Sequence, residues 1–482
     1  MSEQHDRELA VIESVADAPP LKKFAAYAKL SGPGWLQGAI TLGGGSLAGA
    51  LFLGVISGYG LLWVLPLAMI CGIIMLSAIA YVTLSTENRP FHAINNNLSP
   101  LLGWSWLVAT IMANLVWTMP QFALATAAIQ QNLLGGTEFN PTFITLPLFA
   151  IAIFVNYLYE SGGSGAKAFD LIIKIMVGII VLSFFAVVIA LLSAGKLPLG
   201  EIFGGFVPNL SLLNNPAPAY QELIAQSNFG DYWTGTIANS QRDVIIAAVG
   251  TAVGVNMTFL LPYSLLKKKW GPKHRGLSIT DLSIGLFVPF FLATTCVVIA
   301  SASSFHGKGS LPPEAEIAAA KEALAAKISP NDPAAAQIGE SDLLLADMLT
   351  KRDAGALAVT LEPFAGKFIS QKIFGIGVLG MALSTIIILM LMNGLAFQEA
   401  FSSPPPREHS PGATAADGIN DNKALYFFGC GLSGLSGLCF PLLWTDESKA
   451  ALAVPTSVIG GSLIPIAYFT FLLMMNSKKI LG

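Results

Sequence analysis

Charge is what this chain of 482 residues has least of. Asp, Glu, Lys and Arg together make up 11% of it, hydrophobic residues make up 54%, and the mean hydropathy is +0.65. No charged residue occurs between Lys29 and Glu87. This composition excludes a soluble globular domain and predicts a polytopic membrane protein that has the lipid bilayer as its surroundings. The sequence also lacks the basic, aromatic-rich patches that bind nucleic acid, so no nucleic-acid partner is expected.

Cysteine is scarce as well. The four cysteines lie in apolar segments without CxxC spacing, at Cys71, Cys296, Cys430 and Cys439. Such residues behave as small hydrophobic side chains, so neither a disulfide framework nor a cysteine metal site is expected. Residues 1–24 form a polar tail without the apolar core and cleavage site of a signal peptide.

Long apolar segments are abundant, and each is long enough to cross a bilayer as a helix, which takes about 20 residues. Five occur in residues 32–193 and five in residues 243–476, which predicts an all-α fold of about ten transmembrane helices. Because five is odd, the second set enters the membrane from the opposite face, as in an inverted repeat. After the first segment they lie at 60–84, 101–134, 141–158, 167–193, 243–266, 278–303, 374–398, 424–444 and 452–476.

Basic residues predict the orientation, because short loops rich in Lys and Arg stay on the cytoplasmic side. Clusters at 22–29, 267–275 and 478–479 fall on one side of a ten-helix arrangement. We therefore expect a cell-membrane protein with both tails, 1–24 and 477–482, in the cytoplasm. The long polar segments, 194–242 and the insertion 304–372, then lie outside. An Ala- and Glu-rich stretch of the insertion predicts a short solvated helix.

The run Gly43-Gly44-Gly45-Ser46 interrupts the first apolar segment at its centre. Glycine is the poorest helix former after proline, so the run predicts a helix broken in mid-membrane. The sixth segment is interrupted too, since Gly250 and Gly254 precede Asn256-Met257-Thr258 and Pro262 follows. Backbone groups exposed by a break are tolerated in a membrane only where they line a cavity or are buried by protein. Close helix packing at glycines is the alternative explanation of the first break.

Broken helices at corresponding places in two halves point to a substrate site at the membrane midplane. We expect the substrate to contact Gly43, Gly44, Gly45, Ser46, Asn256, Met257 and Thr258. Other polar residues of the spans are Gln37, Thr41, Asn114, Gln121, Ser384, Thr385 and Asn393. Each of these serves equally well for a hydrogen bond between helices. The candidates for further lining of the site are Gln37, Thr41, Gln121, Ser384 and Thr385.

Ionisable residues are nearly absent from the spans, and 101–134 contains none. Asp170, Lys174 and Asp281 lie near helix starts, where an interfacial ion pair or a helix cap is expected. No paired carboxylates and no Ser, His and Asp constellation occur in the spans. We therefore expect no catalytic residue, no enzyme activity and no cofactor.

The oxygen atoms at the breaks favour hard cations over soft transition metals. Ser46, Asn256 and Thr258 are accordingly the candidate metal ligands. The N-termini of the half-helices suit an anionic group such as a carboxylate equally well.

Several short motifs accompany the two breaks: Gly32-Pro33, Gly58-Tyr59-Gly60, Phe305-His306-Gly307, Ala382-Leu383-Ser384-Thr385 and Leu463-Ile464-Pro465. With them the chain resembles the natural resistance-associated macrophage protein (Nramp) family of divalent metal-ion transporters. The likeness covers most of residues 32–476. It implies a LeuT-type fold of inverted five-helix repeats.

The motifs that carry the family's chemistry differ in this chain. Gly43-Gly44-Gly45-Ser46 stands where the family has Asp-Pro-Gly-Asn, so the metal-binding carboxylate is missing and a hydroxyl replaces its amide partner. Asn256-Met257-Thr258 stands where the family has Met-Pro-His, with Asn256 at the ligating methionine and Thr258 at the histidine. A shift of one position returns a soft ligand, Met257. The family's acidic residues of the third helix fall at 120–123, where this chain has none.

Two main hypotheses follow. In the first, an Nramp-like transporter moves a partly hydrated metal cation by alternating access, with altered selectivity and without the residues for the family's proton coupling. In the second, a secondary transporter moves a small organic solute such as an amino acid, with Na⁺ nearby. A receptor or scaffold that kept the fold and lost transport is a third alternative.

Overall fold

The computed structural model describes residues 2–137, 140–328, 337–350, 352–402, 422–443 and 452–481. All regular secondary structure in these residues is helical, which confirms the all-α prediction. Within the described ranges, eight helical segments are long and apolar enough to span a membrane, or nine with the bent pair Pro33–Thr41 and Gly44–Ser57.

The first five predicted spans are each found as helix. Proline occupies the first turn of several of them, where its missing N–H costs nothing, and Ser99 Oγ accepts a hydrogen bond of 3.2 Å from Leu101 N. The elements are α3 (Pro33–Thr41) with α4 (Gly44–Ser57), α5 (Val64–Thr86), α7 (Pro100–Ala127) continued by a π-helix (Ala128–Leu133), α8 (Thr142–Ser161) and α9 (Gly163–Ser193). The short α6 (Pro90–Asn97) joins α5 to α7.

The second set differs from the prediction at three places. Its first helix begins at Gly230 rather than at 243, and its fourth, α20, has 16 residues and is shorter than a full span. The helical segment that contains its third span begins at Ala354 rather than at 374, so the last part of the predicted insertion 304–372 belongs to that segment. The elements are α12 (Gly230–Ala252) with α13 (Val255–Lys267), α14 (Arg275–Leu282) with α15 (Val288–Phe305), α18 (Ala354–Lys367) with α19 (Phe374–Ala400), α20 (Lys423–Leu438) with α21 (Phe440–Leu443), and α22 (Ala453–Met475).

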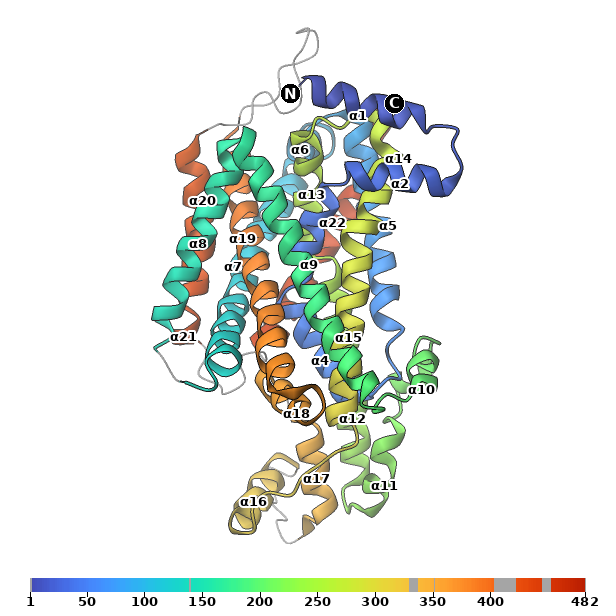
Figure 1. The fold of residues 1–482 in the computed structure, drawn as a ribbon, viewed down its shortest axis with the longest axis vertical. Helices are drawn as coiled ribbons and strands as arrows, with labels where there is room; N and C mark the ends of the chain where they lie inside the picture. The colour runs from blue at the N-terminus through green and yellow to red at the C-terminus, as the bar shows by residue number, and fades with distance from the viewer. Residues whose placement is uncertain are drawn as a thin grey trace.

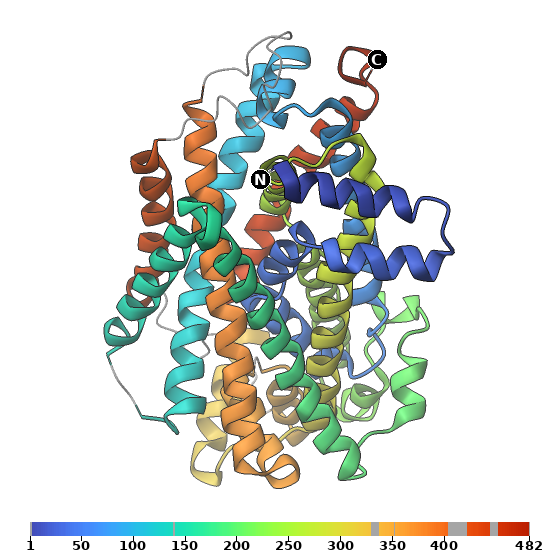
Figure 2. The same cartoon turned by 45° about the horizontal axis from the view of Figure 1, so that its top comes forward.

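The two broken helices run in opposite directions through the bundle. The chain enters α3 and α4 from the end where α1 (Ser2–Ser14), α2 (Pro20–Leu30) and both termini lie, whereas it enters α12 and α13 from the opposite end (Figure 1). This is the relation that an inverted repeat requires. In the second view α19 runs lengthwise through the bundle, and its residues from Ser384 to Gly394 are all buried (Figure 2). Apolar side chains such as Leu171 and Leu182 of α9 are exposed, as on a lipid-facing surface.

Each end of the bundle carries short helices. The predicted polar tail 1–24 contains α1 and the first five residues of α2, and α1 is tied to the bundle by a 2.7 Å ion pair between Glu13 and Lys273. α23 (Lys478–Leu481) lies at the same end. At the other end lie α10 (Leu199–Gly204), α11 (Pro218–Gln226), α16 (Ile317–Ile328) and α17 (Glu340–Met348). The helix predicted in the Ala- and Glu-rich stretch is confirmed as α16, while residues 329–336 and 351 of the insertion and residue 444 of a predicted span lie outside the described residues.

Candidate functional site

The first break separates α3 from α4 by a bend of 53°. Its freed backbone groups are bonded by side chains and by the turn itself: Gly44 N donates to Gln121 Oε1 at 2.7 Å, and Ser46 Oγ donates to Thr41 O. Gly43 lies so close to α19 that an added Cβ would be 2.4 Å from Thr385 Oγ1. The glycine run therefore both ends the helix and lets a neighbouring helix approach, so the packing explanation and the cavity explanation hold together.

The second break separates α12 from α13 at Val253 and Gly254. A Cβ on Gly254 would lie 2.3 Å from the Trp117 ring and 2.8 Å from Asn256 Oδ1. The Trp117 ring is held by a 2.8 Å hydrogen bond from its Nε1 to the carbonyl of Thr456 on α22. The break thus meets α7 and α22 without room for a side chain at residue 254.

A cavity of about 40 Å³ lies between the two breaks. A buried water needs roughly 10–15 Å³ on this measure, so the cavity has room for about three water-sized spheres. Its walls come from both broken helices and from α7, α19 and α22. They consist of Ile40, Thr41, Gly43, Gly45, Ser46, Trp117, Pro120, Gln121, Thr251, Gly254, Asn256, Met257, Thr385, Leu389, Ala453, Thr456 and Ser457.

Most of the residues predicted for the site line this cavity. The structure brings together there Gly43, Gly45, Ser46, Asn256, Met257, Thr41, Gln121 and Thr385. Gly44 is placed between two of them, with its N–H bonded to Gln121. Ser384 lies beside Thr385, and its hydroxyl donates to the carbonyl of Ala39 at 3.1 Å.

Thr258 and Gln37 do not line the cavity. Thr258 Oγ1 accepts a 2.9 Å hydrogen bond from Trp106 Nε1 on α7 and donates to the carbonyl of Val255 within α13, so its hydroxyl is bonded by the protein itself. Gln37 is fully buried on α3, and neither atom of its amide has a hydrogen-bond partner among the described residues. Trp117, Thr251, Thr456 and Ser457 are lining residues that sequence reasoning missed.

Asn256 supplies a buried oxygen that is not hydrogen-bonded. Its side chain is 0% exposed, and Oδ1 has no partner among the described residues. Met257 Sδ accepts a 3.3 Å hydrogen bond from Thr41 Oγ1. The described lining contains no Asp, Glu, His, Lys or Arg, and no group of three metal-binding His, Cys, Asp or Glu occurs anywhere in the described residues. The cavity therefore offers neutral oxygen atoms and one thioether.

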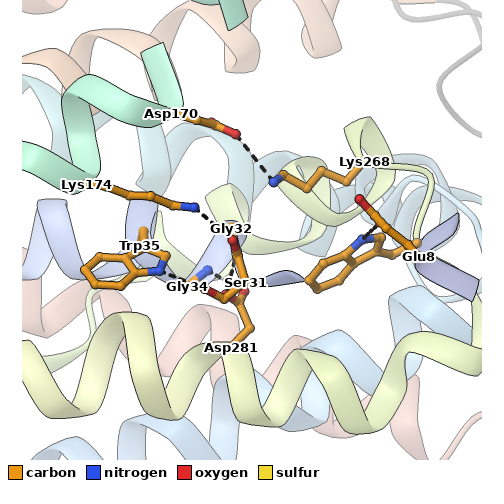
Figure 3. Close-up of polar contacts among 10 residues, drawn as sticks. Glu8, Ser31, Gly32, Gly34, Trp35, Asp170, Lys174, Lys268 and Asp281 are labelled. Carbon is orange, nitrogen blue, oxygen red and sulfur yellow. Dashed lines mark hydrogen bonds and ion pairs between the residues drawn. The ribbon is translucent and has the colours of Figure 1, made fainter. Parts of the chain in front are cut away.

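A cluster of charged residues lies at the start of α3 (Figure 3). Asp281, which is 1% exposed, accepts hydrogen bonds from Gly32 N at 2.7 Å and Gly34 N at 2.6 Å, so it caps α3 from another helix. Lys174 Nζ donates to Ser31 O at 3.0 Å. We call these four contacting residues and Asp281 together the α3 anchor.

Asp170 and Lys174 lie one turn apart on α9, where an interfacial ion pair or a helix cap was expected. Asp170 instead lies 3.4 Å from Lys268 Nζ at the end of α13, and both side chains are partly exposed. Lys174 instead contacts the chain before α3, through the carbonyl of Ser31.

Two of three comparisons with known proteins give matches for this chain. A family model described as Natural resistance-associated macrophage protein-like (Nramp) matches residues 34–339. The comparison with curated proteins gives no match. Among solved structures, a mutant of the Eremococcus coleocola manganese transporter is 14% identical with a TM-score of 0.47, covering 93% of this chain and 95% of that one.

The same transporter in complex with an aromatic bis-isothiourea substituted compound is 13% identical, with a TM-score of 0.47 and coverage of 94% and 95%. A Na⁺-coupled sialic acid symporter in a substrate-bound outward-open state is 12% identical, with a TM-score of 0.35 and coverage of 94% and 85%.

Proposed function

Because the chain belongs to the Nramp family, we propose that it is a membrane transporter that carries a metal cation, bound between its two helix breaks, by alternating access. Family membership makes it a transporter rather than an enzyme. The observation that supports the binding site is Asn256 Oδ1, a fully buried amide oxygen without a hydrogen-bond partner on the wall of the cavity. A buried oxygen left unbonded costs about 1–3 kcal/mol, and a bound cation removes that cost.

The cation keeps part of its water shell in this proposal. A bare dication in a site without a carboxylate would lose far more hydration energy than neutral amide, hydroxyl and carbonyl oxygens return. A cavity with room for about three water-sized spheres accommodates an ion together with one or two waters. Hard cations such as Mg²⁺, Ca²⁺ and Mn²⁺ tolerate such mixed shells of protein oxygen and water.

The volume of the cavity favours a cation over an organic solute. Even a small amino acid has five heavy atoms and two charged groups. The roughly 40 Å³ of the cavity has room for only about three water-sized spheres. The N–H of Gly44, which begins α4, is already bonded to Gln121. The N–H group that a solute carboxylate would bind at the start of α4 is therefore already bonded within the protein.

The test uses the purified full-length protein in liposomes with Mn²⁺, Mg²⁺ and Ca²⁺ supplied separately outside. We expect saturable uptake of at least one cation, and Asn256→Ala is expected to raise its half-saturating concentration about tenfold or more, because the unbonded oxygen is lost. Asn476→Ala, an exposed asparagine at the end of α22, is the matched control and keeps wild-type uptake. Calorimetric binding of an amino acid together with no response to any of the three cations would reject the proposal.

We also infer that both termini face the cytoplasm of a cell-membrane protein. The basic clusters at residues 22–29, 267–275 and 478–479 belong to elements at the end of the bundle that carries α1 and α23. Excess Lys and Arg favours the cytoplasmic side for that end. A fluorescent protein fused after residue 482 is expected to fluoresce, because such fusions mature in the cytoplasm, and an alkaline phosphatase fusion there is expected to be inactive.

A further inference from the structure

Three asparagines from three different helices form a row that ends at the cavity. Asn393 lies on α19, Asn114 on α7 and Asn256 on α13, and all three are 0% exposed. Asn114 Nδ2 donates to Asn393 Oδ1 at 2.9 Å, and Asn256 Nδ2 donates to Asn114 Oδ1 at 2.9 Å. Of the three, Asn256 lines the cavity.

The row has a direction. Asn256 and Asn114 each donate with the amide nitrogen toward Asn393, so the atom left at the cavity end is the oxygen of Asn256. If all three amides turned over, both hydrogen bonds would survive with donor and acceptor exchanged, and Asn256 would present its NH₂ group. An amide oxygen binds a cation, whereas an NH₂ group binds an anion or a carbonyl. The direction of the row therefore decides which charge the cavity accepts.

We propose that Asn114 is a positioning residue that holds the oxygen of Asn256 toward the cavity, and that Asn393 supports it, so that the row selects for cations. This inference rests on the proposed function and assigns two residues outside the cavity to its selectivity. A cation at Asn256 Oδ1 withdraws electron density from the amide and makes Nδ2 a stronger donor to Asn114. Hydrogen bonds in such a row strengthen one another, so ligand and row stabilise the same direction.

The end of the row at Asn393 does not fix the direction of the amides, so the direction depends on the contacts of Asn256 with the cavity and with Asn114. Asn393 Nδ2 has no hydrogen-bond partner among the described residues, so nothing at that end replaces the influence of the cavity. A residue at position 114 that can only accept a hydrogen bond from Asn256 would fix the direction of the Asn256 amide by itself. Aspartate in place of Asn114 does so in either protonation state, because an ionised carboxylate accepts and a protonated one keeps a carbonyl oxygen.

The experiment measures cation binding by calorimetry, with Mn²⁺, Mg²⁺ and Ca²⁺ titrated singly into the purified protein. Asn114→Leu is expected to weaken binding about tenfold, because the Asn256 amide loses its partner and turns freely. Asn114→Asp is expected to bind at least as tightly as wild type. The matched control is Thr118→Val, one turn along α7, which removes the buried contacts of Thr118 with Asn114 O and Ser433 Oγ but leaves the row in place.

Double variants separate orientation from charge and packing. In the background of Asn256→Ala, neither Asn114→Leu nor Asn114→Asp is expected to change the remaining affinity, since both act through the missing amide. A gain from Asn114→Asp in that background would mean that its charge attracts the cation directly, which overturns the inference. Wild-type affinity in a folded Asn114→Leu protein would overturn it as well. If the wild type binds no cation at all, the proposed function fails instead.

Discussion

Gly254 is the residue at which the second break, the Trp117 ring and the oxygen of Asn256 meet. A methyl group there would lie 2.3 Å from the ring and 2.8 Å from the oxygen. We expect Gly254→Ala to weaken cation binding about tenfold, because the ring or the Asn256 amide must shift and the cavity changes shape. The control is Gly250→Ala one turn earlier, where the nearest atom is 3.6 Å away and a methyl group fits. Equal calorimetric affinities of the two variants would contradict this account.

Single residues of the site were predictable where the backbone itself is unusual. The glycines at 43–45 and the interruption before Asn256 predicted the two breaks, because helix propensity is a local property. Thr456 and Ser457 were missed because they lie in an apolar helix with no break, and only the packing of α22 brings them to the cavity. Thr258 was predicted as a ligand from its position near Asn256 at the break, yet its hydroxyl accepts a hydrogen bond from Trp106 of α7.

The helix α3 is the element whose position the α3 anchor controls. Both oxygens of Asp281 accept backbone N–H groups at its start, and Lys174 bonds the carbonyl of Ser31, two residues before α3. We expect Asp281→Asn to loosen α3, since the new NH₂ group meets an N–H donor and one hydrogen bond is lost. Labelling of a cysteine at residue 37, introduced as Gln37→Cys with the four native cysteines replaced, then accelerates about tenfold from the end that carries the termini.

Asp170→Asn is the control for this labelling experiment. It removes a carboxylate from a neighbouring helix, but the partly exposed pair that it breaks with Lys268 is worth about 1 kcal/mol or less. Its labelling rate is expected to match the parent protein. Unchanged labelling in Asp281→Asn would mean that the packing of α3, and not the anchor, keeps residue 37 closed to the reagent.

Helices were predicted well where the hydropathy of the sequence alone defines them. They were predicted less well where contacts with distant parts of the chain define their ends. The apolar spans were found within a few residues, because a run of about 20 apolar residues has few alternatives in a membrane. The helix α12 begins at Gly230 rather than at 243 because its first turns are polar and lie beyond the apolar window. The cap from Asp281 to Gly32 joins residues 249 positions apart, a pairing that no local pattern predicts.

The whole molecule is expected to transport without a proton partner at the site. The described lining of the cavity has no titratable side chain. Outside the spans, burial and the nearby Arg89 guanidinium lower the pKa of His92 to about 4, and burial lowers the pKa of His306. Because both folded pKa values lie below the usual 6.5, these histidines are neutral above that pH in the folded and the unfolded protein. As the pH falls below 6.5 the unfolded chain binds protons first, so stability is lost from there downward, and for His92 the loss is complete below about pH 4.

An acidic exterior should therefore not drive uptake. In liposomes with the membrane potential clamped, we expect initial cation uptake to differ by less than about twofold between external pH 6.5 and 8.0, and a trapped pH dye to report no proton entry. Proton entry in fixed ratio to the cation would contradict this expectation. The protons would then have to pass through Asp281 or Glu399, the buried carboxylates of the candidate spans in the described residues, and Glu399 lies 3.0 Å from Arg89. If Glu399 carries the protons, Glu399→Gln abolishes the coupling but leaves the cavity intact.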